Sequence, residues 1–85
     1  GVNDVAGKMD VQVYPNPAQD FIYLNDTKNI DRLEITNLVG AQVKVVDFGS
    51  AGKKSIDISG MKAGLYMVTV RDEQGNARSF KLLKK

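Results

Sequence analysis

The chain of 85 residues contains no cysteine and no histidine, and this absence removes several kinds of chemistry at once. Disulfides, Cys/His zinc sites, thiol nucleophiles and imidazole acid–base catalysis all require one of these side chains. Among the acidic residues, Glu34 with Asp47 or Asp57 could imitate a glycosidase pair, but no strand pattern encloses them in a cleft. Asp26, Asn29 and Asp31 lack the spacing of a calcium loop. We therefore expect no enzymatic activity, no cofactor and no metal.

Long apolar runs and a strong charge of one sign are also missing. No stretch has the length of a transmembrane helix or of a signal-peptide core. Twelve Lys and Arg against ten Asp and Glu leave a net charge of +2, so we expect neither a nucleic-acid partner nor direct membrane insertion. A chain this short forms one domain with a small core and no deep substrate cleft. These limits favour an interaction module.

The residues that are present favour strands. Hydrophobic residues make up 42% and charged residues 26%, which is an ordinary globular composition. Val, Ile and Thr fall in short runs separated by Gly, Asn, Asp and Pro, and the short connections favour antiparallel neighbours. The pattern predicts an all-β sandwich of seven strands at residues 10–14, 20–24, 31–37, 41–48, 54–59, 64–71 and 77–84.

Alternation within these runs predicts which side chains face the core. The run 20–24 is apolar on both faces, because Phe21 and Tyr23 alternate with Ile22 and Leu24. In the other runs the predicted inward residues are Val11, Val13, Leu33, Ile35, Ile56, Ile58, Tyr66, Val68, Val70, Phe80 and Leu82.

Three segments between or beside the strands predict defined turns. Pro15, Asn16 and Pro17 form a rigid corner, for which a polyproline-type ligand is the alternative. The segment 37–40, with Asn37 first and Gly40 fourth, favours a tight hairpin. Tyr66 opens a strand after Met61 and Gly64, which favours a tyrosine corner, in which the phenol bonds to upstream backbone. The alternative is that Tyr66 is simply an aromatic residue of the core.

The last nine residues are the one region with charge of a single sign, because Arg78, Lys81, Lys84 and Lys85 occur there without an acidic residue. Two interpretations stay open. The charges protect an edge strand from aggregation, or an exposed terminal strand is captured by a receptor through β-augmentation and steered by its basic side chains.

An ordered set of short motifs resembles a known family. The set is VYPNP at 13–17, NLVG at 37–40, IDISGM at 56–61, AGLY at 63–66 and KLLK at 81–84. In this order and spacing it resembles the C-terminal sorting domain of the type IX secretion system (Por secretion system), which ends cargo proteins of Bacteroidota. The resemblance runs from about residue 11 to residue 85.

The resemblance implies a seven-stranded antiparallel immunoglobulin-like β-sandwich at 10–85, preceded at 1–9 by a linker or cleavage region. It implies a secretion signal that carries the upstream cargo domain of the same chain through the periplasm and across the outer membrane. The implied partners are the outer-membrane translocon and a surface sortase that removes the domain, leaving cargo at the cell surface or secreted. The implied translocon-recognition residues are Gly64, Tyr66, Lys81, Leu82, Leu83, Lys84 and Lys85, and the structural turn residues are Pro15, Asn16, Pro17 and Gly40.

Two other functions fit a small sandwich. The first is a carbohydrate-binding or adhesive accessory module of a secreted enzyme. Against it, the chain has no Trp, and most of its three Tyr and three Phe lie at strand positions that can face the core. The second is an inert spacer. A sorting signal differs from both in one expectation: deleting residues 81–85 stops export while the sandwich stays folded.

Overall fold

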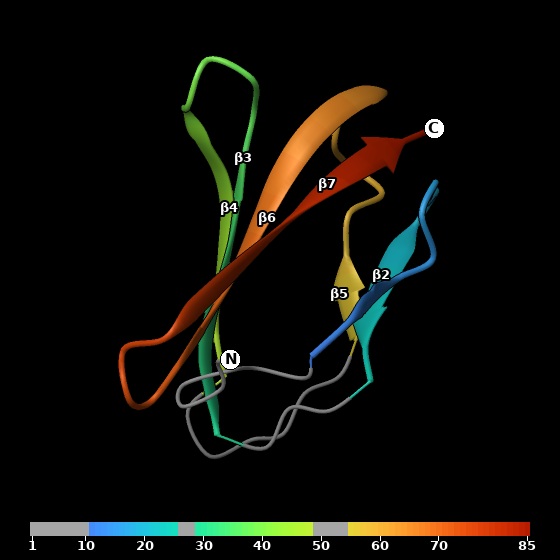
Figure 1. Cartoon of the computed structure of the whole chain (residues 1–85). Helices are drawn as coiled ribbons and strands as arrows, with labels where there is room; N and C mark the ends of the chain where they lie inside the picture. The colour runs from blue at the N-terminus through green and yellow to red at the C-terminus, as the bar shows by residue number, and fades with distance from the viewer. Residues whose placement is uncertain (1–10, 26–28, 49–54) are drawn as a thin grey trace, which may run out of the picture.

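The computed structural model describes residues 11–25, 29–48 and 55–85, and over these residues the chain is all-β (Figure 1). The expected linker at 1–9 lies outside the described residues. No helix that could cross a bilayer occurs in the described ranges. The seven strands are β1 (Val13–Tyr14), β2 (Phe21–Leu24), β3 (Ile30–Thr36), β4 (Gln42–Asp47), β5 (Ser55–Asp57), β6 (Gly64–Asp72) and β7 (Ala77–Lys84). The predicted strand content is confirmed.

The strands form two antiparallel sheets that face each other as two layers (Figure 1). The smaller sheet has the order β1-β2-β5, and the larger has the order β4-β3-β6-β7, so that β4 and β7 are the edges of the larger sheet. An isolated parallel bridge joins Ala18, which follows β1 in the chain, to Lys84 near the end of β7. The chain's first described residues therefore contact its last ones.

The core fills the space between the two layers. Ile22 and Leu24 of β2 and Ile56 of β5 are at most 2% exposed, and they meet Leu33 and Val68 of the larger sheet, which are fully buried. Burial of each such side chain contributes about 1.5–3 kcal/mol relative to exposure. The predicted inward residues are confirmed as buried except two, Val13 and Phe80, which are only partly buried against the core.

The position of Phe80 explains its partial exposure. The strands of the smaller sheet are shorter than those of the larger sheet, so among the described residues they cover only part of its inner face. The guanidinium of Arg78 lies over the Phe80 ring, 5.3 Å from its centroid, and covers it with a cation–π contact.

The predicted hairpin between β3 and β4 is confirmed. The amide of Gly40 donates to the Asn37 carbonyl at 3.0 Å, and Asn37 Oδ1 accepts from the amides of Val39 and Ala41 at 3.1 and 2.9 Å. Gly40 has a φ of +89°, a conformation that a residue with a side chain rarely adopts. The turn carries Leu38 and Val39 at its tip, where they are 73% and 88% exposed.

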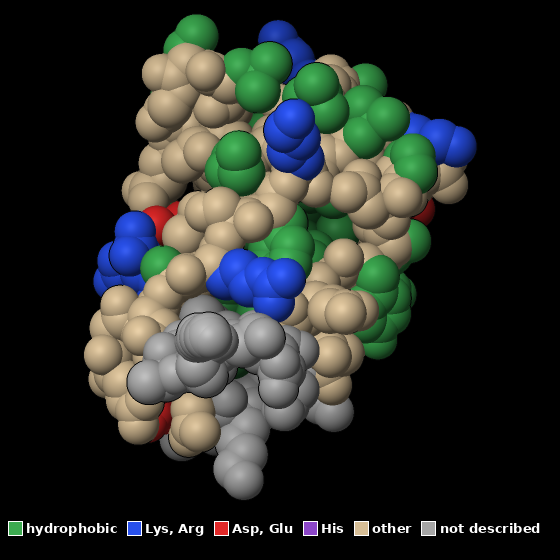
Figure 2. All heavy atoms as spheres, viewed as in Figure 1, with side chains coloured by type: hydrophobic (Ala, Val, Ile, Leu, Met, Phe, Trp, Pro, Cys, Tyr) green, Lys and Arg blue, Asp and Glu red, His purple; other side chains and the backbone are tan. Residues whose placement is uncertain are grey.

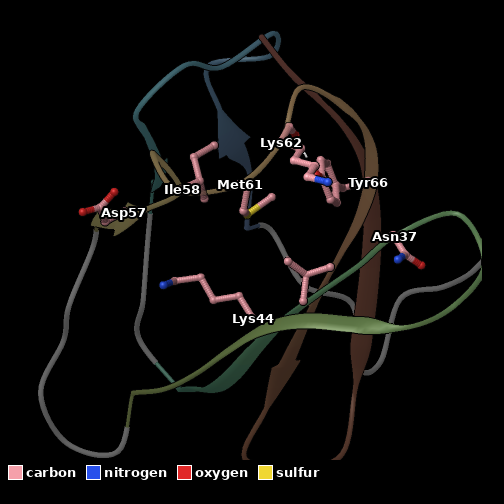
Figure 3. Close-up of a pocket in the computed structure, with 9 residues that line it drawn as sticks. Asn37, Lys44, Asp57, Ile58, Met61, Lys62 and Tyr66 are labelled. Atoms are coloured by element: carbon pink, nitrogen blue, oxygen red, sulfur yellow. Dashed lines mark hydrogen bonds between the residues drawn. The ribbon is translucent and has the colours of Figure 1, made fainter.

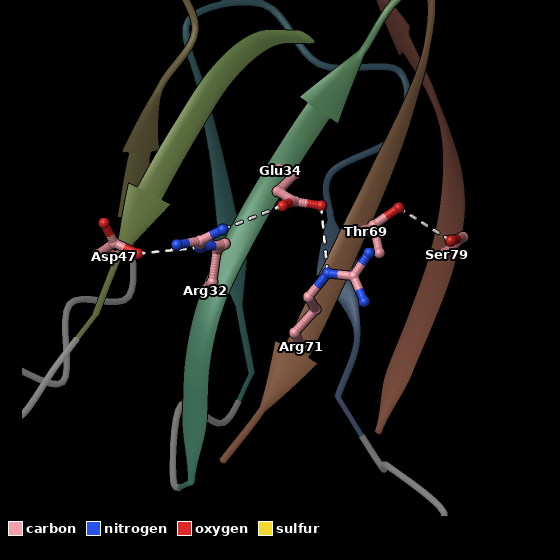
Figure 4. Close-up of polar contacts among 6 residues, drawn as sticks. All are labelled: Arg32, Glu34, Asp47, Thr69, Arg71 and Ser79. Carbon is pink, nitrogen blue, oxygen red and sulfur yellow. Dashed lines mark hydrogen bonds and ion pairs between the residues drawn. The ribbon is translucent and has the colours of Figure 1, made fainter. Parts of the chain in front are cut away.

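A row of ion pairs crosses the outer face of the larger sheet (Figure 4). Arg32 bonds to Asp47 at 3.1 Å and to Glu34 at 3.5 Å, and Arg71 bonds to Glu34 at 3.3 Å. Glu34 and Asp47 are thus tied to the same arginine, while Asp57 belongs to the other sheet. Glu34 and Asp47 therefore pair with arginines across β4, β3 and β6, and they do not form an acid–base pair with each other.

Candidate functional site

The C-terminal strand β7 lies at an edge of the larger sheet, as the captured-strand hypothesis requires. Its side chains alternate: Leu82 and Lys84 are 1% and 7% exposed, whereas Lys81, Leu83 and Lys85 are exposed. The buried Lys84 donates from Nζ to the carbonyl oxygen of Lys85 at 2.8 Å, which gives its ammonium group a partner. One face of β7 therefore belongs to the core and the other faces solvent.

Residues 16–18, which we call the clip, hold the outer edge of β7. The Asn16 side chain donates to the Lys81 carbonyl at 2.8 Å and accepts from the Leu83 amide at 3.0 Å. The Ala18 amide donates to the Leu83 carbonyl at 2.9 Å, and the Lys85 amide donates to the Ala18 carbonyl at 2.8 Å. The peptide bonds preceding Pro15 and Pro17 are both cis. The predicted rigid corner is thus also a strand-like partner for the end of the chain.

The clip corrects the expectation of a freely capturable terminal strand. In an antiparallel strand, alternate residues turn both backbone groups to the same side. The register between β6 and β7 is unbroken from Ala77 to Lys84. The residues whose backbone groups point away from β6, toward the open edge of the sheet, are therefore Ala77, Ser79, Lys81 and Leu83. The clip engages the last two of these. Among the described residues, the part of the edge left for β-augmentation lies around Ala77 and Ser79, and not at 81–85.

The segment 64–66 pairs directly with the end of β7, since Gly64, Leu65 and Tyr66 face Lys84, Leu83 and Leu82. The predicted tyrosine corner is confirmed. The Tyr66 hydroxyl donates to the Lys62 carbonyl at 2.6 Å, and the ring is 8% exposed. Gly64 has a φ of +151°, which suits glycine at the entry to the strand.

The structure brings three predicted segments together at one corner: the clip, the segment 64–66 and the end of β7. Gly40, by contrast, lies in the β3–β4 turn, and β4 is the opposite edge of the sheet. Of the seven predicted recognition residues, Tyr66, Leu82 and Lys84 are buried. Outside the clip, the exposed side chains at this corner are Lys81, Leu83 and Lys85, together with Leu65, which is 48% exposed and faces Leu83. We call these four residues the terminal patch.

Leu65 was missed at the sequence level, although its position in the alternating run 64–71 indicated an outward side chain. Leu65 and Leu83 form an exposed apolar pair, with lysines at 81 and 85 on either side along β7. An apolar centre with a polar rim is an arrangement that protein interfaces commonly have.

A groove of about 490 Å³ opens beside the tyrosine corner, between β4 and the connection from β5 to β6 (Figure 3). Val43, Ile58, Met61 and Tyr66 supply its apolar part, and its charged residues are Lys44, Lys62 and Asp57. Hydrogen bonds from the Ser59 hydroxyl and then from the Ser59 amide hold the pKa of Asp57 below its usual value. Asp57 therefore serves as the acceptor of a local turn.

No group of three or more acidic, Cys or His side chains that could hold a metal ion occurs in the part of the chain that the structure describes. Of the weak calcium candidates, Asp26 lies outside that part.

A row of aromatic rings on the outer face of the smaller sheet was not expected. Tyr14, Phe21 and Tyr23 are 49%, 42% and 38% exposed. The ring centroids of Tyr14 and Tyr23 are 5.7 Å apart, and those of Phe21 and Tyr23 are 6.4 Å apart. Only Phe48 and Tyr66 are buried aromatics, so the expectation that the core claims most of the aromatic residues is wrong. The run 20–24, apolar on both faces, was the signal for this row.

The fold and the corner define a small all-β interaction module whose edge strand carries exposed cations. Residues 12–85 match the family described as the secretion system C-terminal sorting domain, and the chain belongs to this family. Searches of curated proteins and of solved structures gave no significant match. Membership implies a type IX secretion C-terminal sorting signal, which interacts with the secretion machinery and is exported across the outer membrane.

Proposed function

We propose that this chain directs an upstream cargo domain through the periplasm to the outer-membrane translocon of the type IX system. The cargo then reaches the cell surface or the medium, and the chain itself catalyses no reaction. We further propose that residues 10–85 form an immunoglobulin-like sandwich and that a surface sortase cleaves within 1–9. The division into sheets of three and four strands and the tyrosine corner at Tyr66 support the immunoglobulin-like assignment.

The observation that carries the proposal is the terminal patch on a strand that is held rigidly. The patch displays Lys81, Leu83 and Lys85 beside Leu65, while buried Leu82 and the clip fix the strand beneath them. A preformed surface loses little conformational entropy when a partner binds. Exposed lysines increase the rate of encounter with an acidic partner surface. In this proposal the translocon reads the side chains of the folded patch.

The experiment compares a fluorescent cargo carrying a Sec signal peptide with and without the 85-residue chain at its C-terminus. Each is expressed in a Bacteroidota host and in the same host lacking the type IX translocon. We expect cargo at the surface or in the medium only with both the chain and the translocon, and periplasmic cargo otherwise. Periplasmic retention of the complete fusion in the intact host would contradict the proposed function. Equal export without the chain would make it a spacer.

A further inference from the structure

The aromatic row continues into a groove at the C-terminal end of the chain. The groove has a volume of about 370 Å³. Its lining includes two proline rings, one just before the clip and one within it, two aromatic rings of the row and a charged residue of each sign. These residues are Pro15, Pro17, Phe21, Tyr23, Asp20 and Lys85. Figure 2, drawn from the same side as Figure 1, shows hydrophobic side chains exposed along the edge of the molecule where β2 lies.

We propose that the row Tyr14, Phe21 and Tyr23 and this groove form a second docking surface for a protein of the secretion machinery. The partner presents an apolar segment with a carboxylate beside it. This inference rests on the proposed function, because it assigns a further contact area to the same recognition event.

Continuity with the terminal patch is the first argument. Lys85 belongs to the patch and also lines the groove, and its amide donates to the Ala18 carbonyl at 2.8 Å. The clip therefore forms the boundary between the two surfaces. A partner that covers Lys85 meets the proline rings and Phe21 without any change in the fold.

The second argument is the exposure and rigidity of the rings. Tyr14 and Tyr23 are direct partners in the β1–β2 register, and the planes of Phe21 and Tyr23 are inclined by only 27°. The rings support one another on a sheet, so binding orders few side-chain torsions. Tyr and Phe are enriched in protein interfaces, and Tyr is enriched among hot spots.

Charge is the third argument, and it favours a protein over a neutral glycan. The segment 77–85 has four basic and no acidic residues. Lys84 is buried, and the exposed Arg78 lies over the Phe80 ring toward the other end of β7, so Lys81 and Lys85 are the exposed cations at the terminal patch. A carboxylate on the partner pairs with Lys85. Asp20, which lines the same groove, repels that carboxylate, so the partner binds in one orientation. A neutral sugar would contact the rings but would gain nothing from the charge of Lys85.

The test replaces the rings by threonine, which keeps strand propensity, in the cargo fusion. The variants are Tyr14→Thr/Phe21→Thr/Tyr23→Thr and the milder Tyr23→Thr. The matched control is Leu38→Ser/Val39→Ser, which removes two apolar side chains that are 73% and 88% exposed at the β3–β4 turn. Thermal unfolding of each purified 85-residue chain checks folding, and the purified chains are also applied to a glycan array. We expect about a tenfold loss of export for the triple variant, a smaller loss for Tyr23→Thr and no loss for the control.

The outcomes separate this inference from the proposed function. If the unchanged fusion is exported and both ring variants, still folded, are exported equally well, the inference is wrong and the proposed function stands. If the unchanged fusion stays in the periplasm, the proposed function fails and the inference fails with it. If export is normal but the wild-type chain binds a glycan and the triple variant does not, the row is a carbohydrate site and the inference is overturned.

Discussion

Asn16 shows how one side chain connects the two ends of the fold. Its amide group makes one hydrogen bond with the Lys81 carbonyl and another with the Leu83 amide. Each bond contributes about 0.5–1.5 kcal/mol. Asn16→Ala is therefore expected to lower the free energy of unfolding by roughly 1–2 kcal/mol in urea titration. Gln19→Ala, at an exposed neighbour, is the control and should change it by less than about 0.5 kcal/mol. Equal effects would mean that the clip does not stabilise β7.

Tyr66 gives a second test at the residue scale. Tyr66→Phe removes the hydroxyl that bonds to the Lys62 carbonyl at 2.6 Å while the ring stays in place. We expect a loss of about 1 kcal/mol in the free energy of unfolding, because a part-buried carbonyl loses its partner. Tyr23→Phe, on the exposed row, should be close to neutral. A neutral Tyr66→Phe would contradict a stabilising role for the corner.

The hydrogen bonds of Asp72 make the stability of the fold depend on pH. Its carboxylate accepts from the side-chain amide of Asn76 at 2.9 Å and from the backbone amides of Asn76 and Gln74 at 2.8 and 2.9 Å. These bonds, the Asn76 side chain first, hold the pKa of Asp72 below its usual value. Because the pKa is lower in the folded state, the carboxylate stabilises the fold above its unfolded pKa of about 4. That stability is lost as pH falls through the folded pKa.

The measurement compares wild type with Asp72→Asn by thermal unfolding near pH 7 and about one unit below the ordinary Asp pKa. We expect the variant to melt at a lower temperature than wild type at neutral pH and the gap to narrow in acid. Asp57, whose pKa is also lowered, is present in both proteins, so its contribution cancels. A difference in melting temperature that stays constant with pH would show that ionisation of Asp72 does not stabilise the fold.

Neighbouring residues of strand β7 have different roles, because one faces the core and the next faces solvent. Leu82 is 1% exposed and Leu83 is 40% exposed. Leu82→Ala is expected to cost about 2–5 kcal/mol in the free energy of unfolding, because it leaves a cavity between the sheets. Leu83→Ala should cost less than about 1 kcal/mol and lower export of a folded fusion. Similar stability losses at the two positions would contradict the assigned faces.

The same strand leads us to predict that deleting residues 81–85 destabilises the sandwich as well as removing the terminal patch. The deletion removes Leu82 from the core and the acceptor and donor groups that the clip binds. A loss of export after this deletion would therefore report unfolding as well as lost recognition. Substitutions on the exposed face avoid this ambiguity.

At the scale of the whole molecule, the alternation of residues such as Leu33 and Ile35 was enough to predict the strands and most of the core. Asn37 and Gly40 predicted their turn, since the conformation depends on local residues only. The clip on β7 was not predictable in this way, and the apolar residues on both faces of the run 20–24 did not show that the face with Phe21 and Tyr23 stays exposed. Both depend on which strands become neighbours and how much of each face the shorter sheet covers, and these are properties of the packed molecule.

The central claim is that the secretion machinery reads the exposed face of the folded terminal patch. The most direct measurement is export of the cargo fusion carrying Lys81→Glu/Lys85→Glu, compared with Lys44→Glu/Lys62→Glu, which changes net charge equally at other sites. Thermal unfolding of each purified variant confirms that it is folded. The account predicts about a tenfold loss of surface and secreted cargo for the 81/85 variant and normal export for the control. Normal export of a folded 81/85 variant would contradict it.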